Sequence, residues 1–274
     1  MKHYISLGAG VQSSAMALMA AHKEITPMPE AAIFADTQHE PKEVYDWLEW
    51  LKEQLPFPVH EVSKGDLLKD ATKLKKKKST GEIYSETMIP FYTTHPVTGE
   101  RTAILKRQCT SNYKIIPIVK EYRKLAQVKR GEKSIVVTQW LGISTDEMRR
   151  MKPAKEKWIE NRWPLIERRM NRNSCKEWMQ AKGYPEPPRS ACTFCPFHND
   201  KEWREMQRTD TASFNAACKA EKELNTAKSQ NANWSGDIFF HRSCKPLDKI
   251  DFRTDVELGQ QLLWDDECEG MCGV

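Results

Sequence analysis

The chain has 274 residues, a length that suits one large domain or two modest ones at roughly 150 residues per domain. Hydrophobic residues make up 39% of it and charged residues 30%, which excludes collagen, extended disorder and low-complexity fibres. The 43 Lys and Arg residues against 38 Asp and Glu give a net charge of +5, which tolerates an anionic partner but does not demand one.

The N-terminal residues lack a basic region followed by a long apolar run, and no stretch approaches the roughly 20 apolar residues of a membrane span. We therefore expect a cytoplasmic protein with no membrane partner. Because disulfides are rare in that compartment, we expect the eight cysteines to bind metal, to take part in redox chemistry or to be packed as thiols.

Along the first half of the chain, short apolar runs alternate with helical patterns. Taken in order, the elements are a strand at 3–7, a helix at 13–23, a strand at 31–35, a helix from about Pro41, a strand at 59–62, a helix at about 112–126 and a strand at 134–140. Strands that alternate with helices are typical of a parallel sheet with helices on its faces. We therefore expect an α/β fold with a Rossmann-like parallel sheet over residues 1–160.

Two regions depart from this alternation. Residues 64–105 contain four consecutive lysines at 75–78 and several turn signals, so we expect a mobile basic insertion there. From about residue 160 the chain becomes rich in Trp, Arg, Pro and Cys. Because the helical patterns there are short, residues 161–274 are expected to form a cysteine-rich, mostly helical C-terminal region.

The segment 8–14, Gly-Ala-Gly-Val-Gln-Ser-Ser, lies between the first strand and the first helix. Backbone N–H groups at a helix N-terminus attract anions, and serines there can cap the helix or donate to phosphate oxygens. The segment is neither a Walker A loop nor Gly-x-Gly-x-x-Gly, since Ser13 holds the third glycine position. On this chemistry alone, a phosphate-binding loop and an ordinary glycine turn with a serine cap are equally favoured.

The 8–14 loop resembles the pyrophosphate-binding loop of the ATP-pyrophosphatase and phosphoadenosine-phosphosulfate (PAPS) reductase superfamily, Ser-Gly-Gly-x-Asp-Ser, with Gln12 where many members have Asp. Residues 33–37 resemble the family's second strand, whose end lies beside the adenosine. Residues 142–150 are similar to its Gly-x-Arg-x-x-Glu-Ser-x-x-Arg stretch, with Gly142, Glu147 and Arg150 in register. This resemblance implies binding of ATP or PAPS, with Mg²⁺ as a further ligand.

The same resemblance implies which residues form the nucleotide site. They are Gly8, Ala9, Gly10, Gln12, Ser13, Ser14, Asp36, Thr37, Gly142, Glu147, Arg149 and Arg150. Either arginine can pair bidentately with phosphate or sulfate oxygens, and a solvated helix face is the other interpretation of this pair.

Cys192-Thr-Phe-Cys195-Pro can hold one metal or cluster, or it can act as a redox dithiol. The Pro-rich approach at 185–188 and the flanking Phe194 favour a buried metal site. Iron-containing adenosine-phosphosulfate reductases carry Cys-Cys-x-x-Arg-Lys-x-x-Pro, and alignment on Lys114 and Pro117 places Cys109 on the first cysteine of that motif.

Thr110 occupies the position of the second cysteine, and Cys175 is its natural replacement. The resemblance therefore implies a [4Fe–4S] cluster on Cys109, Cys175, Cys192 and Cys195. Structural zinc with the same ligands stays open, because sequence does not separate the two. Cys175 is almost equally well explained as a plain packed thiol, with Cys244 as the main alternative fourth ligand, and Cys218 is expected to be packed in a helix.

Near the C-terminus, Glu267-Cys268 resembles the Glu-Cys-Gly segment that carries the nucleophile of sulfonucleotide reductases, although Glu269 replaces the glycine. Cys268 is therefore a candidate catalytic thiol. The other interpretation gives the tail cysteines Cys268 and Cys272 no catalytic role.

These resemblances imply an enzyme of the PAPS reductase family, either a transferase or an oxidoreductase. In one reaction an acceptor attacks the α-phosphate of ATP, pyrophosphate leaves, and the adenylylated acceptor is modified; the acceptor is a nucleic acid or a sulfur carrier. In the other a thiol reduces adenylyl sulfate or PAPS and sulfite is released, with a thioredoxin-like reductant. The sequence also allows a metal-stapled nucleic-acid-binding protein without catalysis, and a homo-oligomer.

Overall fold

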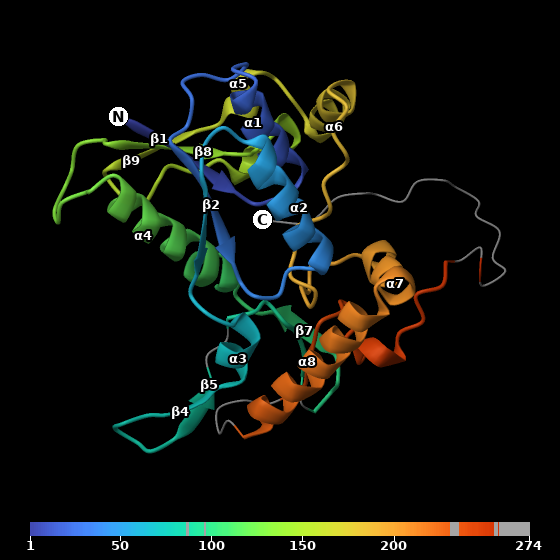
Figure 1. Ribbon diagram of the computed structural model, residues 1–274. Coiled ribbons are helices and arrows are strands. Elements are labelled where there is room, and N and C mark those ends of the chain that lie inside the picture. Colours follow the sequence, from blue (N-terminus) through green and yellow to red (C-terminus); the bar gives the residue numbers. More distant parts are fainter. Residues whose placement is uncertain (86–87, 96, 231–235, 255–256, 258–274) are drawn as a thin grey trace. The chain divides into compact units, whose positions relative to one another are not determined.

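The computed structural model describes residues 1–85, 88–95, 97–230, 236–254 and 257 (Figure 1). The chain divides into two compact units. Unit 1 comprises residues 1–65 and 110–191, and unit 2 comprises residues 66–109 and 192–274. The domain boundary expected near residue 160 therefore falls inside unit 1, while the insertion joins the C-terminal part of the chain in unit 2.

Unit 1 contains a five-stranded parallel sheet in the order β3-β2-β1-β8-β9. Its strands are β1 (Lys2–Leu7), β2 (Ala31–Asp36), β3 (Val59–Ser63), β8 (Val137–Leu141) and β9 (Ile159–Arg162). With helices packed on the sheet, this confirms the expected α/β class. The chain runs outward from β1 to β3 and then returns to place β8 on the other side of β1, so the strand order reverses between β1 and β8.

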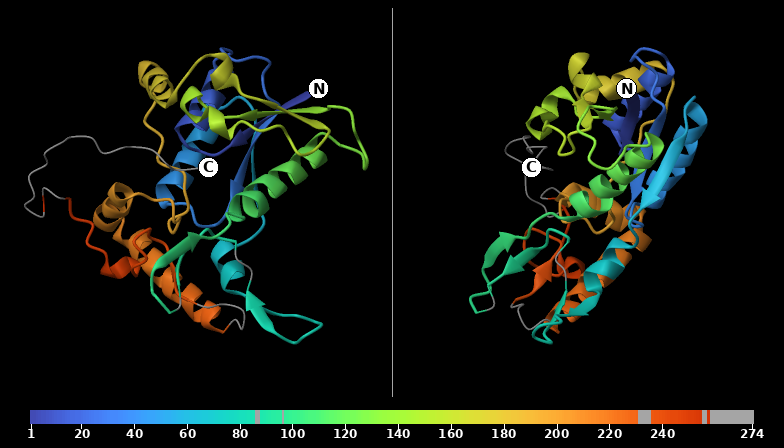
Figure 2. Two further views of the ribbon diagram at one scale, coloured as in Figure 1. Left: turned by 180° about the vertical axis from the view of Figure 1, so that it is seen from behind. Right: turned by 90° about the vertical axis from the view of Figure 1, so that its left-hand side faces the viewer.

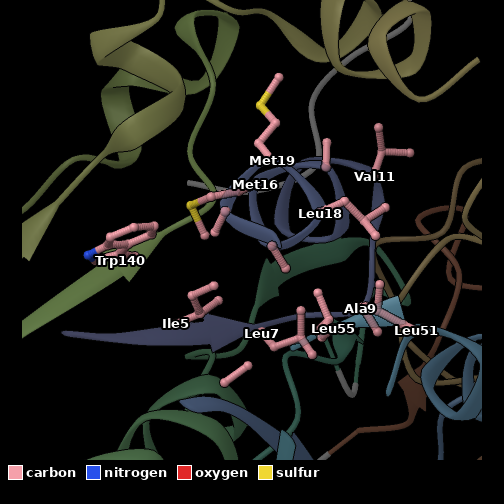
Figure 3. Close-up of a cluster of buried hydrophobic side chains, with 14 of the residues drawn as sticks. Ile5, Leu7, Ala9, Val11, Met16, Leu18, Met19, Leu51, Leu55 and Trp140 are labelled. Atoms are coloured by element: carbon pink, nitrogen blue, oxygen red, sulfur yellow. The ribbon is translucent and has the colours of Figure 1, made fainter. Parts of the chain in front are cut away.

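The central strands β1 and β2 have buried side chains on both faces of the sheet. Alternate residues of β1 and β2, such as Ile5 and Phe34, pack with α1 (Val11–Ala21), α2 (Lys42–Gln54) and α6 (Arg172–Ala181) in one apolar cluster (Figure 3). The residues between them, such as Tyr4 and Ile33, pack against α4 (Ile116–Leu125) on the other face. Helix α4 is the green helix that runs alongside the sheet in Figure 2. Burial on both faces explains why the strands are apolar runs without alternation.

Two helices have other boundaries than the sequence predicts. Helix α1 spans Val11–Ala21 instead of 13–23, and it is buried on nearly all sides from Val11 to Ala20, which fits its run of Ala, Met and Leu. The helix expected at 112–126 begins with a π-helical turn at Thr110–Ile115 and becomes α-helical only at Ile116. Pro117 lacks an amide hydrogen, so the regular α-helical hydrogen-bond ladder cannot continue through it. The remaining elements of unit 1 are the 3₁₀ turn η2 (Thr145–Arg150) and α5 (Pro164–Glu167).

The segment expected to be a basic insertion forms a helix and four strands in unit 2. Helix α3 (Leu67–Thr72) is capped by the side chain of Asp66, which accepts from the Lys69 backbone N–H at 2.9 Å. Strands β4 (Leu74–Lys76) and β5 (Ile83–Ser85) form one antiparallel hairpin, and β6 (Tyr92–Thr94) pairs with β7 (Arg101–Ile104) in another. Gly81 and Gly99 adopt positive φ angles of 74° and 69° at the two turns.

The C-terminal part of unit 2 adds β10 (Ile238–Phe239), which pairs with β6, and the helices α7 (Asp200–Thr209) and α8 (Thr211–Ser229), followed by the 3₁₀ turn η3 (Leu247–Lys249). Phe240 lies between Phe91 and Phe194, with ring centroids 5.7 and 5.8 Å apart. The core of unit 2 thus joins segments far apart in sequence. Within the described residues, no helix has both the length and the apolarity needed to span a membrane.

Candidate nucleotide site

The 8–14 loop leaves the carboxyl end of β1 and opens directly into α1. Gly10 is the N-cap residue, and Ala9 before it adopts a left-handed backbone with φ of 55° while fully buried. The Ser14 N–H donates to the Gly10 carbonyl at 2.9 Å, which makes it the first bond of the helical ladder. The N–H groups of the first turn therefore stand at the helix end, where the helix dipole favours an anion.

The two serines of the loop have different partners. Ser13 Oγ donates to the Gly10 carbonyl and accepts from the Gly8 N–H, both at 3.2 Å, so its hydroxyl closes the loop on itself. Ser14 is fully buried, and its Oγ accepts from Trp47 Nε1 at 3.0 Å. Ser14 therefore fixes α1 to α2, whereas Ser13 shapes the loop.

Gly142 directly follows β8, which pairs with β1 on the side away from β2, and its backbone closely approaches this loop. A Cβ placed on Gly142 would lie 2.9 Å from both the N and the Cα of Ser13, so only glycine fits without a shift. Gln12 Nε2 also donates across the same contact, to Ser144 Oγ at 3.4 Å. The contact lies where the strand order reverses, and ligands of open α/β sheets bind in the crevice beyond the strand ends at such a point.

Asp36 organises the turn after β2. Its Oδ1 accepts from the Gln38 N–H at 2.7 Å and from the Tyr45 hydroxyl at 2.8 Å. Burial and the hydrogen bond to Asp36 raise the pKa of Tyr45 above its usual value, so Tyr45 remains a hydroxyl donor. Thr37 is buried beside this turn, with 1% of its surface exposed. Asp36 is thus held as an acceptor by the turn and by α2.

The arginines expected to close the site lie in the 3₁₀ turn η2. Arg150 Nη1 donates to Glu147 Oε1 at 2.7 Å, so this pair lies within one turn. Arg149 is exposed. Both arginines are thus on an exposed 3₁₀ turn, with Arg150 paired to Glu147.

Three residues outside the expected nucleotide site, Glu40, Lys114 and Ser190, form a chain of contacts that reaches the loop. The side chain of Glu40 is completely buried; Oε1 accepts from Lys114 Nζ at 2.9 Å and Oε2 from Ser190 Oγ at 3.3 Å. The Cβ of Ser190 lies 3.8 Å from the position that a Cβ on Gly10 would occupy. These partners lie 74 and 150 positions from Glu40 in the chain, so no local periodicity identifies them.

The proposed metal ligands do not share one environment. Cys109, Cys192 and Cys195 belong to unit 2 and are partly exposed. Cys175 belongs to unit 1, where it is fully buried among apolar residues of α6, and burial raises the pKa of its thiol to about 12. Because metals bind the thiolate, this environment opposes ligation by Cys175 and favours its packed-thiol interpretation.

The remaining cysteines divide in the same way. Cys244 belongs to unit 2 and is partly exposed, whereas Cys218 is buried in α8, where burial raises the pKa of its thiol to about 11. Cys268 and Cys272 lie outside the described residues. In the part of the chain that the structure describes, no group of three or more His, Cys, Asp or Glu side chains is arranged to hold a metal ion. The ligand set Cys109, Cys175, Cys192 and Cys195 therefore stays a prediction.

Comparisons with known proteins add little beyond this geometry. No family model matches the chain, and neither does any curated protein. Among solved structures, a PAPS reductase from Candida auris in a phosphate complex is similar, with a TM-score of 0.42 and 14% sequence identity. The similarity covers 68% of this chain and 75% of that chain, and at this level it assigns no function.

Proposed function

We propose that unit 1 binds an adenine nucleotide at the 8–14 loop and that the protein transfers the adenylyl group of ATP to an acceptor. The observation that carries this proposal is the loop itself, placed at the reversal of strand order and packed by Gly142. First-turn N–H groups would hold the phosphates, with the Asp36 turn beside the adenosine. An acceptor oxygen attacks the α-phosphorus, the bond from the α-phosphorus to the bridging oxygen breaks, and pyrophosphate leaves.

The residues contribute to this reaction mainly by binding and orientation. Ser13 keeps the loop closed around the phosphates, and Arg149 is an accessible cation for the departing pyrophosphate. Mg²⁺, when bound, would neutralise that pyrophosphate. Gln12 offers an amide where the resembling family has a carboxylate, and its nitrogen already donates to Ser144, so Gln12 does not fit a strong Mg²⁺ ligand.

The test separates the two chemistries that the sequence allows. The full chain is mixed with ATP and candidate acceptors, and separately with PAPS and thioredoxin. We expect ATP binding by calorimetry and pyrophosphate release, with Ser13→Ala weakening binding by about tenfold, which corresponds to about 1.4 kcal/mol. Ser79→Ala, at an exposed serine of the β4–β5 hairpin, is the matched control.

Sulfite release from PAPS, lost in Cys268→Ser, would instead support the reductase. In that reaction a cysteine thiolate attacks the sulfur of PAPS, the bond from that sulfur to the phosphate oxygen breaks, and thioredoxin supplies the electrons that release sulfite. If the wild-type protein binds neither nucleotide, both enzymatic proposals are wrong.

The β4–β5 hairpin favours nucleic acid as the acceptor. Residues 66–85 carry six lysines against three acidic residues, and Lys73, Lys76 and Lys78 are exposed, whereas Lys77 is paired with Glu82 at 2.7 Å. We expect the protein to bind RNA or DNA with an affinity that falls as the salt concentration rises. In a plot of log affinity against log salt concentration, replacing the three exposed lysines by Ala should reduce the magnitude of the slope by roughly two to three. Replacement of three exposed lysines elsewhere, Lys120, Lys124 and Lys129, should change the slope less.

We also propose that Cys109, Cys192 and Cys195 bind a metal or an iron–sulfur cluster, with Cys244 replacing Cys175 as the fourth ligand. The support is that all four belong to unit 2, while the thiol of Cys175 lies in the apolar core of unit 1. Because these four thiols do not form a metal-holding group in the structure, the proposal requires their side chains to come together when the metal binds. Anaerobic purification with metal analysis and an absorption spectrum tests this. We expect Cys244→Ser to lose metal and Cys175→Ser to keep it; the reverse result would restore Cys175 as the ligand.

A further inference from the structure

Glu40 is a completely buried carboxylate beside the candidate nucleotide loop. Such side chains are rarely buried unless they are paired, because an unpaired charge loses its hydration in the interior without gaining a partner. The pairing of Glu40 is complete in the sense that each carboxylate oxygen has a donor: Lys114 Nζ at 2.9 Å on Oε1 and Ser190 Oγ at 3.3 Å on Oε2. This arrangement fixes the carboxylate from two sides.

The surroundings of Glu40 tie it to the candidate site. Its backbone N–H donates to the Tyr45 hydroxyl at 3.3 Å, and that hydroxyl donates to Asp36. On its other side, Ser190 packs against Gly10 of the loop. Glu40, in the segment that follows β2, is therefore connected through Ser190 to the loop that follows β1, the strand that pairs with β2.

Lys114 differs from Glu40 in exposure. The side chain of Lys114 is 34% exposed, whereas that of Glu40 is 0% exposed. A free lysine side chain has four flexible carbon–carbon bonds, and ordering it costs conformational entropy. The buried carboxylate holds the ammonium in one place before any ligand arrives, while part of the side chain still faces solvent.

We propose that Glu40 is a positioning residue that holds Lys114 toward the phosphates of a nucleotide bound at the 8–14 loop, with Ser190 fixing Glu40. This inference rests on the proposed nucleotide function and deepens it, because it names a cation for the phosphate groups that the loop sequence does not contain. It also predicts an effect of opposite sign to simple electrostatics. Glu40→Gln removes a negative charge near an anion site, so charge alone would tighten ATP binding, whereas lost positioning weakens it.

The experiment is calorimetric titration of the full chain with ATP and, separately, with adenosine. We expect Lys114→Met and Glu40→Gln each to weaken ATP binding about tenfold and to leave adenosine binding unchanged, since adenosine has no phosphate. Because Glu40 acts through Lys114, the double variant should bind ATP no more weakly than Lys114→Met alone. Lys114→Arg should recover part of the loss. Glu49→Gln and Lys120→Ala, at exposed positions of α2 and α4, are the controls.

Thermal unfolding accompanies each titration, because a buried charge left alone can destabilise the chain. If Glu40→Gln or Lys114→Met does not fold, the double variant, which removes both charges, and Ser190→Ala replace it. For Ser190→Ala we expect a loss of two- to fivefold with ATP and none with adenosine. For the double variant we expect about the tenfold loss with ATP and none with adenosine.

Unchanged or tighter ATP binding by Glu40→Gln, or an equal loss for adenosine, would overturn the positioning role. The same outcomes in the replacement variants overturn it as well. Wild-type protein that binds no ATP would overturn the proposed nucleotide function itself, which is a distinct result.

Discussion

The two units of this chain differ in how regularly their elements follow one another along the sequence. In unit 1, strands alternate with helices, and side chains at every second position of β1 and β2 pack on opposite faces of one sheet. In unit 2, the antiparallel sheet takes β6 and β7 from the insertion and β10 from the C-terminal part. The stacked rings of Phe91, Phe194 and Phe240 come from three separate segments.

This difference shows which kind of structure a local pattern can encode. The buried strands of unit 1 appear as short apolar runs and its helices as longer apolar or striped segments, so these elements can be predicted from short stretches of the sequence. A core made of single aromatic residues from distant segments leaves no period. The cysteines of the two units also differ in exposure. Cys175 is a buried thiol in the core of unit 1, whereas unit 2 contains the partly exposed thiols Cys109, Cys192, Cys195 and Cys244.

The largest effect we expect is on thiol reactivity. With a pKa of about 12, Cys175 has roughly a thousandth of the thiolate of an ordinary thiol near pH 8, and it is buried as well. In reduced, chelator-treated protein, alkylation followed by mass spectrometry should modify Cys192 at least about a hundredfold faster than Cys175. Denatured protein, in which the rates should converge, is the control. Equal native rates would remove this distinction between the units.

One core truncation in each unit tests whether the two units unfold independently of each other. Leu18→Ala in α1 should cost about 2–5 kcal/mol, and Phe240→Ala about 3–5 kcal/mol, because both side chains are fully buried. Hydrogen exchange should show that Leu18→Ala loosens β1 and β2, whereas Phe240→Ala loosens β6 and β10. Uniform loosening by both variants would mean that the two units unfold as one.

A smaller effect is expected at the contact between Gly142 and the loop. Gly142→Val inserts a side chain whose Cβ would lie 2.9 Å from Ser13, and such overpacking costs about 1–3 kcal/mol. It should also weaken ATP binding by displacing the loop. Gly10→Ala, where the nearest neighbour of the new Cβ is 3.8 Å away, should cost less than Gly142→Val, because only the helix N-cap preference for Gly over Ala is lost. Equal unfolding midpoints would show that the contact is loose.

The smallest effect concerns pH and unit 2. Burial raises the pKa of Asp200, but hydrogen bonds from His241 and Arg242 outweigh it, so the pKa lies below its usual value. A lowered carboxyl pKa adds stability above about pH 3.8, and this stability is lost as the pH falls through the folded-state value. Because the side chain is 42% exposed, Asp200→Asn should cost less than about 1 kcal/mol at pH 7.

Unfolding curves against pH check this expectation. The difference between wild type and Asp200→Asn should shrink below pH 3.8, while Glu205→Gln, exposed on the same helix, should show no such trend. A difference that stays constant down to the lowest pH would assign the effect to packing.

The sequence by itself determined the alternating elements of unit 1 and the position of the 8–14 loop, because strand burial, helix composition and glycine sterics all act between near neighbours. Even there, tertiary detail changed boundaries, as the π-helical turn before Pro117 shows. The insertion expected to be mobile forms α3 and two hairpins, whose short strands lack a readable period.

Only the tertiary structure decided which distant residues meet. It placed buried Glu40 between Lys114 and Ser190, pressed Gly142 against Ser13, and assigned Cys175 to an apolar core. The physical reason is that a hydrogen bond or a close backbone approach depends on positions in space set by the whole sheet. A single carboxylate, glycine or thiol in the sequence carries no sign of the partner that the fold brings to it.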